Sequence, residues 1–288
     1  MNRRLSTCVA ATSLLLFASA CNRAGTPVAV AAPQDAPPTS DRFVFPITVE
    51  GIAPGSAVDM SAMNPAPLTE KHRIVAKNGH YYDASGKRVR FLATGVGAAA
   101  VFPTHDEAER MASRLHRAGI NMVRLHHLDA TWETPNIFHF EGGWNGAKPQ
   151  INIDPRSLER FDYLVAQFKK QGIYVDLNLH IVRPWNAAMG FPDADKINPE
   201  GKAVSYFEPK AIELQRNYAR EMLSHKNPYT GLTYANDPVV AIVEITNEDT
   251  LLGAAEGITT LPAHYRGILQ TGWNAFLKRK YKTSAGLQ

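Results

Sequence analysis

Apolar positions between residues 89 and 281 follow two alternating patterns. Short runs rich in β-branched residues are typical of strands that are buried on both faces. Each run is followed, after a polar stretch, by apolar residues spaced three or four apart, and this spacing predicts an amphipathic helix. The pattern therefore predicts four consecutive strand–helix units, with strands at 89–94, 120–127, 173–180 and 239–246 and helices beginning near 104, 154, 209 and 261.

Residues that commonly begin helices support three of these predictions. Thr104 is followed three positions later by Glu107, which is the sequence of a capping box. Asp154 and Pro155 are a typical N-cap and first helical residue, and Pro209 is placed to begin the third helix. Upstream of these units, Asn78-Gly79 between apolar segments predicts a β-hairpin, and "DASGK" at 83–87 predicts a second turn.

Four strand–helix units in succession imply a parallel sheet with right-handed crossovers. The strand-to-helix loops at 129–153 and 181–207 are long and polar, and this asymmetry is typical of a (β/α)8 TIM barrel with its active site on the long-loop side. A doubly wound sheet is the alternative, but no Gly-rich phosphate loop follows any strand. We therefore expect about the first four β/α units of a TIM barrel, preceded by a small β-hairpin.

The N-terminus has the features of an export signal. "MNRR" provides positive charge, the apolar stretch after it is too short to span a bilayer, and "FASAC" resembles the lipobox of bacterial lipoproteins. This resemblance predicts a signal peptide at 1–20, lipidation of Cys21 and anchoring in a membrane at the periplasm or cell surface. Plain secretion after cleavage near Ala20 is the alternative. Residues 21–42, rich in Ala and Pro, predict a flexible tether, and 43–71 form an extension with no clear pattern.

Composition and charge exclude several classes of function. The chain is 44% hydrophobic, its net charge is +4, and its one dense basic run is "LKRKYK" at 277–282, so nucleic acid is not an expected partner. The adjacent His126 and His127 do not have metal-ligand spacing, and the chain contains no HExxH, CxxC or GxSxG motif. We expect no metal and no cofactor. Cys8 would leave with the signal peptide, so no disulfide is expected in the mature chain.

Polar residues end three of the four predicted strands, although a buried strand has no packing reason to finish in this way. The second strand ends in Arg124, His126 and His127, the third in His180, and the fourth in Asn247 followed by Glu248. The carboxyl ends of parallel strands meet at one edge of a sheet, so these side chains are expected to converge there.

The segment "EITNED" at 244–249 resembles the Glu-x-x-Asn-Glu signature that ends the fourth strand in clan A glycoside hydrolases, especially the cellulase-like family 5. The resemblance covers about residues 72–288 and implies that Glu248 is the general acid/base. It further implies that Asn247 binds the sugar 2-hydroxyl and that Arg124 orients the nucleophile. By the same resemblance, His180 and one or both of His126 and His127 would line the cleavage subsite. Family members usually have Pro after the catalytic Glu, where this chain has Asp249.

A retaining glycosidase needs a carboxylic acid and a second carboxylate about 5 Å away. Glu244 lies about 13 Å from Glu248 along one strand, so we expect it to be a buried structural carboxylate. Nothing in the sequence marks Asp249 or Asp129 as the nucleophile, and the family resemblance implies a Glu at the seventh strand, beyond Gln288. We therefore expect residues 72–288 to be the N-terminal half of a catalytic barrel, which would be inactive and poorly stable alone.

Two alternatives remain open: a non-catalytic carbohydrate-binding lipoprotein derived from a glycosidase, and a half-barrel that pairs with itself. The expected substrate is a β-linked polysaccharide or oligosaccharide, with the glycan, the linkage and endo or exo action undetermined. Trp132, Trp144 and Trp185 lie in the long loops, where Trp faces can stack on sugar rings, whereas Trp273 on the fourth helix is expected to pack in the core.

Overall fold

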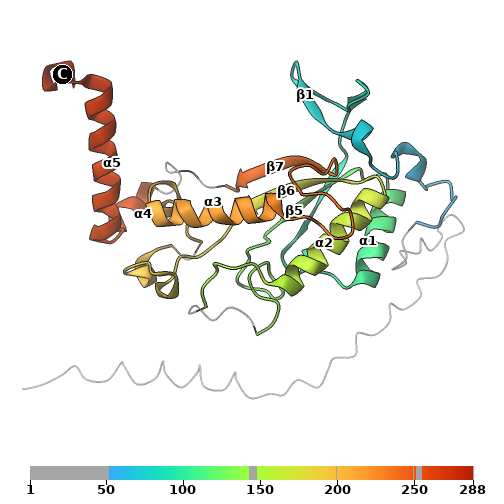
Figure 1. The fold of residues 1–288 in the computed structure, drawn as a ribbon, viewed down its shortest axis with the longest axis horizontal. Coiled ribbons are helices and arrows are strands. Elements are labelled where there is room, and N and C mark those ends of the chain that lie inside the picture. Colours follow the sequence, from blue (N-terminus) through green and yellow to red (C-terminus); the bar gives the residue numbers. More distant parts are fainter. Residues whose placement is uncertain (1–51, 143–147, 199, 249, 251–254, 288) are drawn as a thin grey trace, which may run out of the picture. The chain divides into compact units, whose positions relative to one another are not determined.

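The computed structural model describes residues 52–142, 148–198, 200–248, 250 and 255–287 (Figure 1). All described residues belong to one compact unit, Thr48–Gln288. Cys21 and Trp144 lie outside the described residues. The strands are β1 (Val75–Lys77), β2 (His80–Tyr82), β3 (Arg88–Val89), β4 (Ala93–Gly97), β5 (Met122–His126), β6 (Tyr174–His180) and β7 (Val240–Thr246). The α-helices are α1 (His105–Arg117), α2 (Pro155–Lys170), α3 (Pro209–Ser224), α4 (Ala255–Thr260), α5 (Ala263–Tyr281) and α6 (Ser284–Leu287).

The predicted hairpin is confirmed as an antiparallel sheet of β1, β2 and β3. Asn78 and Gly79 have φ values of 51° and 74°, which is the conformation that a two-residue hairpin turn of this kind requires. The second predicted turn is also confirmed, because the Asp83 carboxylate accepts hydrogen bonds from the backbone N–H groups of Ser85 and Lys87.

The prediction of one strand at 89–94 was wrong, because the segment divides between two sheets. β3 ends at Val89 in the hairpin, and β4 begins at Ala93 in the parallel sheet. Asn121 forms hydrogen bonds with both ends of the segment 90–92, which separates the two strands. Its Oδ1 accepts from the Leu92 backbone N–H at 2.8 Å, and its Nδ2 donates to the Arg90 carbonyl at 2.9 Å.

The predicted helix starts are confirmed. Thr104 and Glu107 form the capping box of α1, and the Asp154 carboxylate accepts the Arg156 backbone N–H at the start of α2. α3 begins at Pro209 as expected, and the preceding Glu208 accepts the Ala211 backbone N–H.

The second sheet is parallel, and its strand order β4-β5-β6-β7 is also the order in the sequence. A doubly wound sheet reverses its strand order at a switch point, whereas a barrel adds each strand beside the previous one. The four described strands show no such reversal, so their topology is that of barrel units. Crossovers of one hand place the connecting helices on one face of the sheet, and Figure 1 shows α1, α2 and α3 in front of it.

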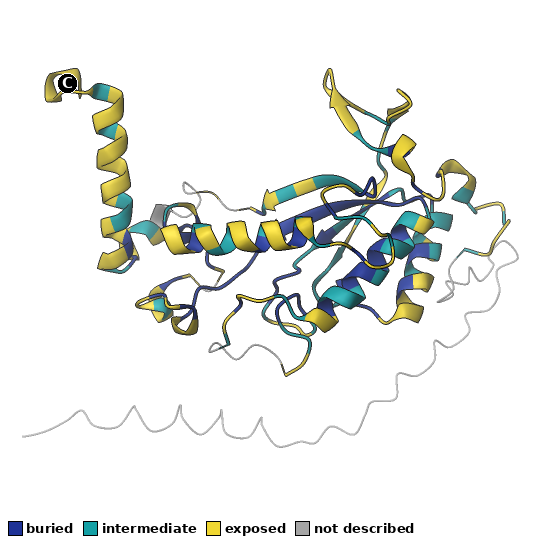
Figure 2. Ribbon diagram, viewed as in Figure 1, coloured by how far each residue is buried: buried dark blue, intermediate teal, exposed yellow. Residues whose placement is uncertain are grey.

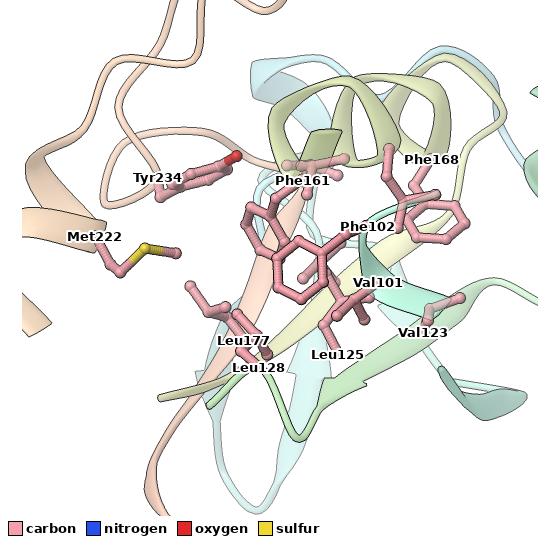
Figure 3. Packing of buried hydrophobic residues seen from close by; sticks show 14 of the residues in the cluster. Val101, Phe102, Val123, Leu125, Leu128, Phe161, Phe168, Leu177, Met222 and Tyr234 are labelled. Carbon is pink, nitrogen blue, oxygen red and sulfur yellow. The ribbon is translucent and has the colours of Figure 1, made fainter. Parts of the chain in front are cut away.

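The two faces of this sheet differ in chemistry because side chains alternate along a strand. One face packs against the helices. Figure 3 shows Leu125 and Leu177 from the sheet lying close to Phe161 from α2, and all three side chains are fully buried. The opposite face, which we call the inner face, carries polar side chains at alternate positions of three strands: Arg124 and His126 on β5, Asp176, Asn178 and His180 on β6, and Glu244 on β7.

Figure 2 shows exposed residues along β7 and α5, and several of them are large and apolar. Val243 and Ile245 are 39% and 77% exposed. The prediction that Trp273 packs in the core was wrong, since Trp273 is 54% exposed and stacks on Phe276, which is itself 40% exposed. Tyr265 is the one side chain of α5 that is buried. No helix in the described part of the chain is both long enough and apolar enough to cross a membrane.

Candidate active site

The carboxyl ends of β5, β6 and β7 bring the predicted residues to one edge of the parallel sheet. In the strand register Gly97 lies beside His126, and His180 lies beside Thr246. The backbone N–H of Asn247 donates to the His180 carbonyl at 2.9 Å and extends the pairing of β6 and β7 by one residue. The strand tips therefore form one continuous edge, as the sequence predicted.

Arg124 binds Glu244, which lies within β7, and Asn247, which directly follows it. Its Nε donates to Glu244 Oε1 at 3.0 Å, and its Nη2 donates to Glu244 Oε2 at 2.5 Å and to Asn247 Oδ1 at 2.8 Å. The hydrogen bonds from Arg124 hold the pKa of Glu244 below its usual value, and the same pairing raises the pKa of Arg124. Glu244 was predicted to be buried, but its side chain is 29% exposed and forms an ion pair across the inner face.

Asp176 lies below this ion pair on β6, opposite Arg124 in the register, and is 8% exposed. Burial, followed by the charge of Glu244, raises the pKa of Asp176 to about 6. Its Oδ1 has no hydrogen-bond partner among the described residues. We did not identify Asp176 from the sequence, although the polar alternation of 176, 178 and 180 in an otherwise apolar strand could have marked it.

Glu248 follows Asn247 at the tip of β7 and is exposed. Its backbone has a φ of 42°, a left-handed conformation that is uncommon for residues other than Gly. Asn247, by contrast, is only 8% exposed. The tip of β7 thus places the Asn247 amide, which is held by Arg124, directly before the solvent-accessible carboxyl group of Glu248.

His126 and His127 follow one another at the tip of β5 and differ in their surroundings. His126 Nδ1 lies 2.7 Å from Asn178 Oδ1 on β6, within hydrogen-bond distance. His127 has a φ of 55°, and its ring lies edge-on to His126 and to Trp132, with centroid distances of 3.8 and 5.2 Å. Burial lowers the pKa of both imidazoles, so both are predominantly neutral at pH 7.

His180 and Trp185 lie side by side and are almost completely buried. Each is only 3% exposed, and their rings are stacked on one another with centroids 6.0 Å apart. Trp185 also stacks on Phe191 and donates its indole N–H to the Gly201 carbonyl. Neither ring is open to solvent in the described part of the chain, and the expectation that His180 lines the cleavage subsite and that Trp185 contacts sugar stays a prediction. Burial lowers the pKa of His180 to about 3, which keeps this imidazole neutral.

Asp129 acts as a connector between two loops. It is 1% exposed, and it accepts hydrogen bonds from the backbone N–H groups of Ile181 and Val182, which follow β6. Burial raises its pKa to about 6. Trp132 is 58% exposed and is therefore the one described loop tryptophan that offers a ring face to a ligand. In the described parts of the chain, no three His, Cys, Asp or Glu side chains cluster as metal ligands would.

Comparison with known proteins agrees with the resemblance noted in the sequence. The family profile described as Cellulase (glycosyl hydrolase family 5) matches residues 82–251. Mannan endo-1,4-beta-mannosidase 2 of Arabidopsis thaliana is 24% identical over 199 residues, which cover 65% of this chain and 43% of that protein. Mannan endo-1,4-beta-mannosidase 5 of the same plant is 23% identical over 121 residues, covering 38% of this chain and 26% of its own length. The chain therefore spans less than half the length of these curated relatives.

Solved structures with a similar arrangement include the endo-1,4-beta-mannanase from Rhizomucor miehei, with a TM-score of 0.45 and 20% identity over 61% of this chain and 48% of that one. The endo-beta-1,4-mannanase from Thermotoga petrophila has a TM-score of 0.40 and 21% identity, over 57% and 36% of the two chains.

Proposed function

Because the chain belongs to the cellulase family, glycosyl hydrolase family 5, we propose that it is part of a retaining glycoside hydrolase that cleaves a β-linked polysaccharide, with Glu248 as the general acid/base. The observation that carries the proposal is the pair Asn247-Glu248 directly after β7. Asn247 is held by Arg124, and Glu248 is exposed at the edge where the strand tips meet. An acid that protonates a glycosidic oxygen has to be reached by substrate from outside the sheet, and Glu248 meets that condition.

The proposed mechanism needs a second carboxylate as the nucleophile, about 5 Å from the acid/base. Two described carboxylates near the site are poor candidates, because Glu244 is bonded to Arg124 and Asp129 is almost completely buried. We therefore assign the nucleophile to neither of them. The Nη1 group of Arg124 makes no hydrogen bond to any described residue, so this donor is available to orient a further carboxylate.

For the substrate we propose a β-1,4-linked mannan. The support is that two curated relatives in the same family are named as mannan endo-1,4-beta-mannosidases. Trp132 is proposed to stack on one sugar ring of the chain, since its exposed indole lies beside His127 at the tip of β5. We further propose that the protein is an exported lipoprotein anchored through Cys21, on the strength of the lipobox-like "FASAC".

The test is the Glu248→Gln substitution in the full-length protein, assayed on mannan and on an aryl β-mannoside with a good leaving group. Loss of the acid should abolish most mannan hydrolysis and spare the first step on the aryl substrate, which needs little protonation. Azide should then accelerate turnover by replacing water as the acceptor. Glu213→Gln, at an exposed position of α3, is the matched control and should leave activity unchanged. If Glu248→Gln hydrolyses mannan at the normal rate, the assignment is wrong. If the unmodified protein binds mannan but turns over no β-glycan, the binding-protein alternative is favoured.

A further inference from the structure

Glu244 reaches across a whole strand to bind Arg124. Arg124 is on β5 and Glu244 on β7, with β6 between them, so the pair bridges two inter-strand spacings of about 4.8 Å each. The contact is bidentate, with Nε and Nη2 of the guanidinium each donating to a different carboxylate oxygen at 3.0 and 2.5 Å. Two parallel hydrogen bonds fix the plane of the guanidinium as well as its position.

The fixed guanidinium determines how Asn247 is oriented. Arg124 Nη2 lies 2.8 Å from the Asn247 side chain, and because a guanidinium can only donate, Asn247 must present its Oδ1 to it. The amide nitrogen of Asn247 therefore points away from Arg124, and its two N–H groups make no hydrogen bond to any described residue. Asn247 is 8% exposed, which leaves its side chain little freedom to turn elsewhere.

No other described acid can replace Glu244 without moving Arg124. Asp176 is the nearest alternative by register, but it lies on β6 directly opposite Arg124 and below the level of Glu244, further from the strand tips. A guanidinium that turned toward Asp176 would move away from Asn247. Glu248 is at the tip itself, and its carboxyl group is needed for the chemistry proposed above.

We propose that Glu244 is a positioning residue: its bidentate contact holds Arg124 so that Arg124 fixes Asn247 with its amide N–H groups directed toward a substrate oxygen. This inference rests on the proposed function, since it assumes that Asn247 binds substrate beside the acid/base. Glu244 acts indirectly, through Arg124 and then Asn247, and does not itself contact the sugar. A misplacement of about 1 Å in a substrate-binding group can lower a rate about 100-fold, so Glu244→Gln should lower kcat/KM by about 10- to 100-fold.

The way the loss of kcat depends on the leaving group distinguishes this positioning role from that of a general acid. Asn247→Ala removes a substrate contact that serves every step, so it should lower kcat on substrates with good and poor leaving groups alike. Glu244→Gln should share this pattern, whereas Glu248→Gln should be impaired mainly with poor leaving groups. Arg124→Lys keeps the charge but loses the planar fork, and it should also resemble Asn247→Ala.

A double-mutant cycle provides the decisive measurement in the full-length protein. If Glu244 acts through Asn247, adding Glu244→Gln to Asn247→Ala should lower kcat/KM by less than about threefold more. A merely structural role would instead give additive losses together with a lower melting temperature, and that result would overturn the proposal. Full activity of both Glu244→Gln and Arg124→Lys would also overturn it. Should Glu244→Gln fail to fold, the cycle is measured with Glu244→Asp, which keeps the carboxylate but shortens its reach to Arg124.

Failure of the positioning role can be separated from failure of the proposed function. If Glu248→Gln is inactive on mannan while Glu244→Gln is fully active, the function stands and the positioning role is refuted. If Glu248→Gln is as active as the unmodified protein, the function itself is wrong, and the proposal for Glu244 is overturned with it. Glu213→Gln again serves as the control for loss of a carboxylate at an exposed site.

Discussion

Replacing Asp176 with Asn should stabilise the protein at neutral pH and leave its stability nearly unchanged in mild acid. Asp176 is 8% exposed on the inner face, and its Oδ1 has no hydrogen-bond partner among the described residues. Glu244 already occupies two donors of Arg124, the nearest cation. The charge of Arg124 therefore compensates the buried, ionised form of Asp176 only in part, whereas the protonated form and an Asn side chain are both neutral and of similar size.

The magnitude follows from the pKa of Asp176, which burial and the Glu244 charge raise from 3.8 to about 6. A raised carboxyl pKa means that the folded state binds the proton more tightly than the unfolded state. The free energy of unfolding therefore falls as the pH rises from about 4 to about 6, and the penalty is complete above that window. A shift of about two units corresponds to at most about 3 kcal/mol.

Urea unfolding of the full-length protein, followed by circular dichroism between pH 4 and pH 8, measures this effect. The Asn variant should exceed the unmodified protein by about 1 to 3 kcal/mol at pH 7.5, with the difference shrinking toward zero at pH 4. Asp195→Asn, at an exposed position, is the matched control and should show no such pH dependence. An Asn variant that is destabilised by the same amount at every pH would refute the reasoning, because Asp176 would then be an ionised partner of Arg124.

Three further predictions test the loops and the export signal. Trp132→Ala should raise KM for polysaccharide about tenfold and leave the melting temperature unchanged, because the ring is exposed. Trp185→Ala should instead lower the free energy of unfolding by about 3 to 5 kcal/mol, because the ring is buried, and so act mainly through folding. Equal losses of melting temperature in the two variants would contradict this. Arg183 is 1% exposed, donates to the Gln150 and Leu214 carbonyls and lies over the Phe138 ring, so Arg183→Met should cost about 2 to 3 kcal/mol in urea unfolding, and an unchanged midpoint would refute it. Cys21→Ser should abolish incorporation of labelled palmitate and release the protein from the membrane fraction; persistent labelling would exclude Cys21 as the lipid site.

Much of the architecture could be predicted from local signals. The Asn78-Gly79 turn, the Thr104 capping box, the Asp154 N-cap and the start of α3 at Pro209 all depend on residues within a few positions of each other. Local signals failed at 89–94, where a run of strand-forming residues is divided between two sheets and the residues at the break are hydrogen-bonded with Asn121, about thirty positions further along the chain. They also failed at Trp273, since an apolar residue on a helix is buried only if another element packs against it.

The candidate site also has features that the sequence predicted and features that it did not. The sequence alone determined which residues come to the carboxyl edge of the sheet, because parallel strands align their ends and side-chain alternation is fixed by the strand period. Only the tertiary structure decided what those residues do there. It paired Glu244 with Arg124 across β6, left Asp176 Oδ1 without a hydrogen-bond partner among the described residues, and buried His180 and Trp185 while Trp132 stayed exposed. Burial and pairing depend on distances between residues that are far apart in the chain, and these distances exist only once the strands are side by side.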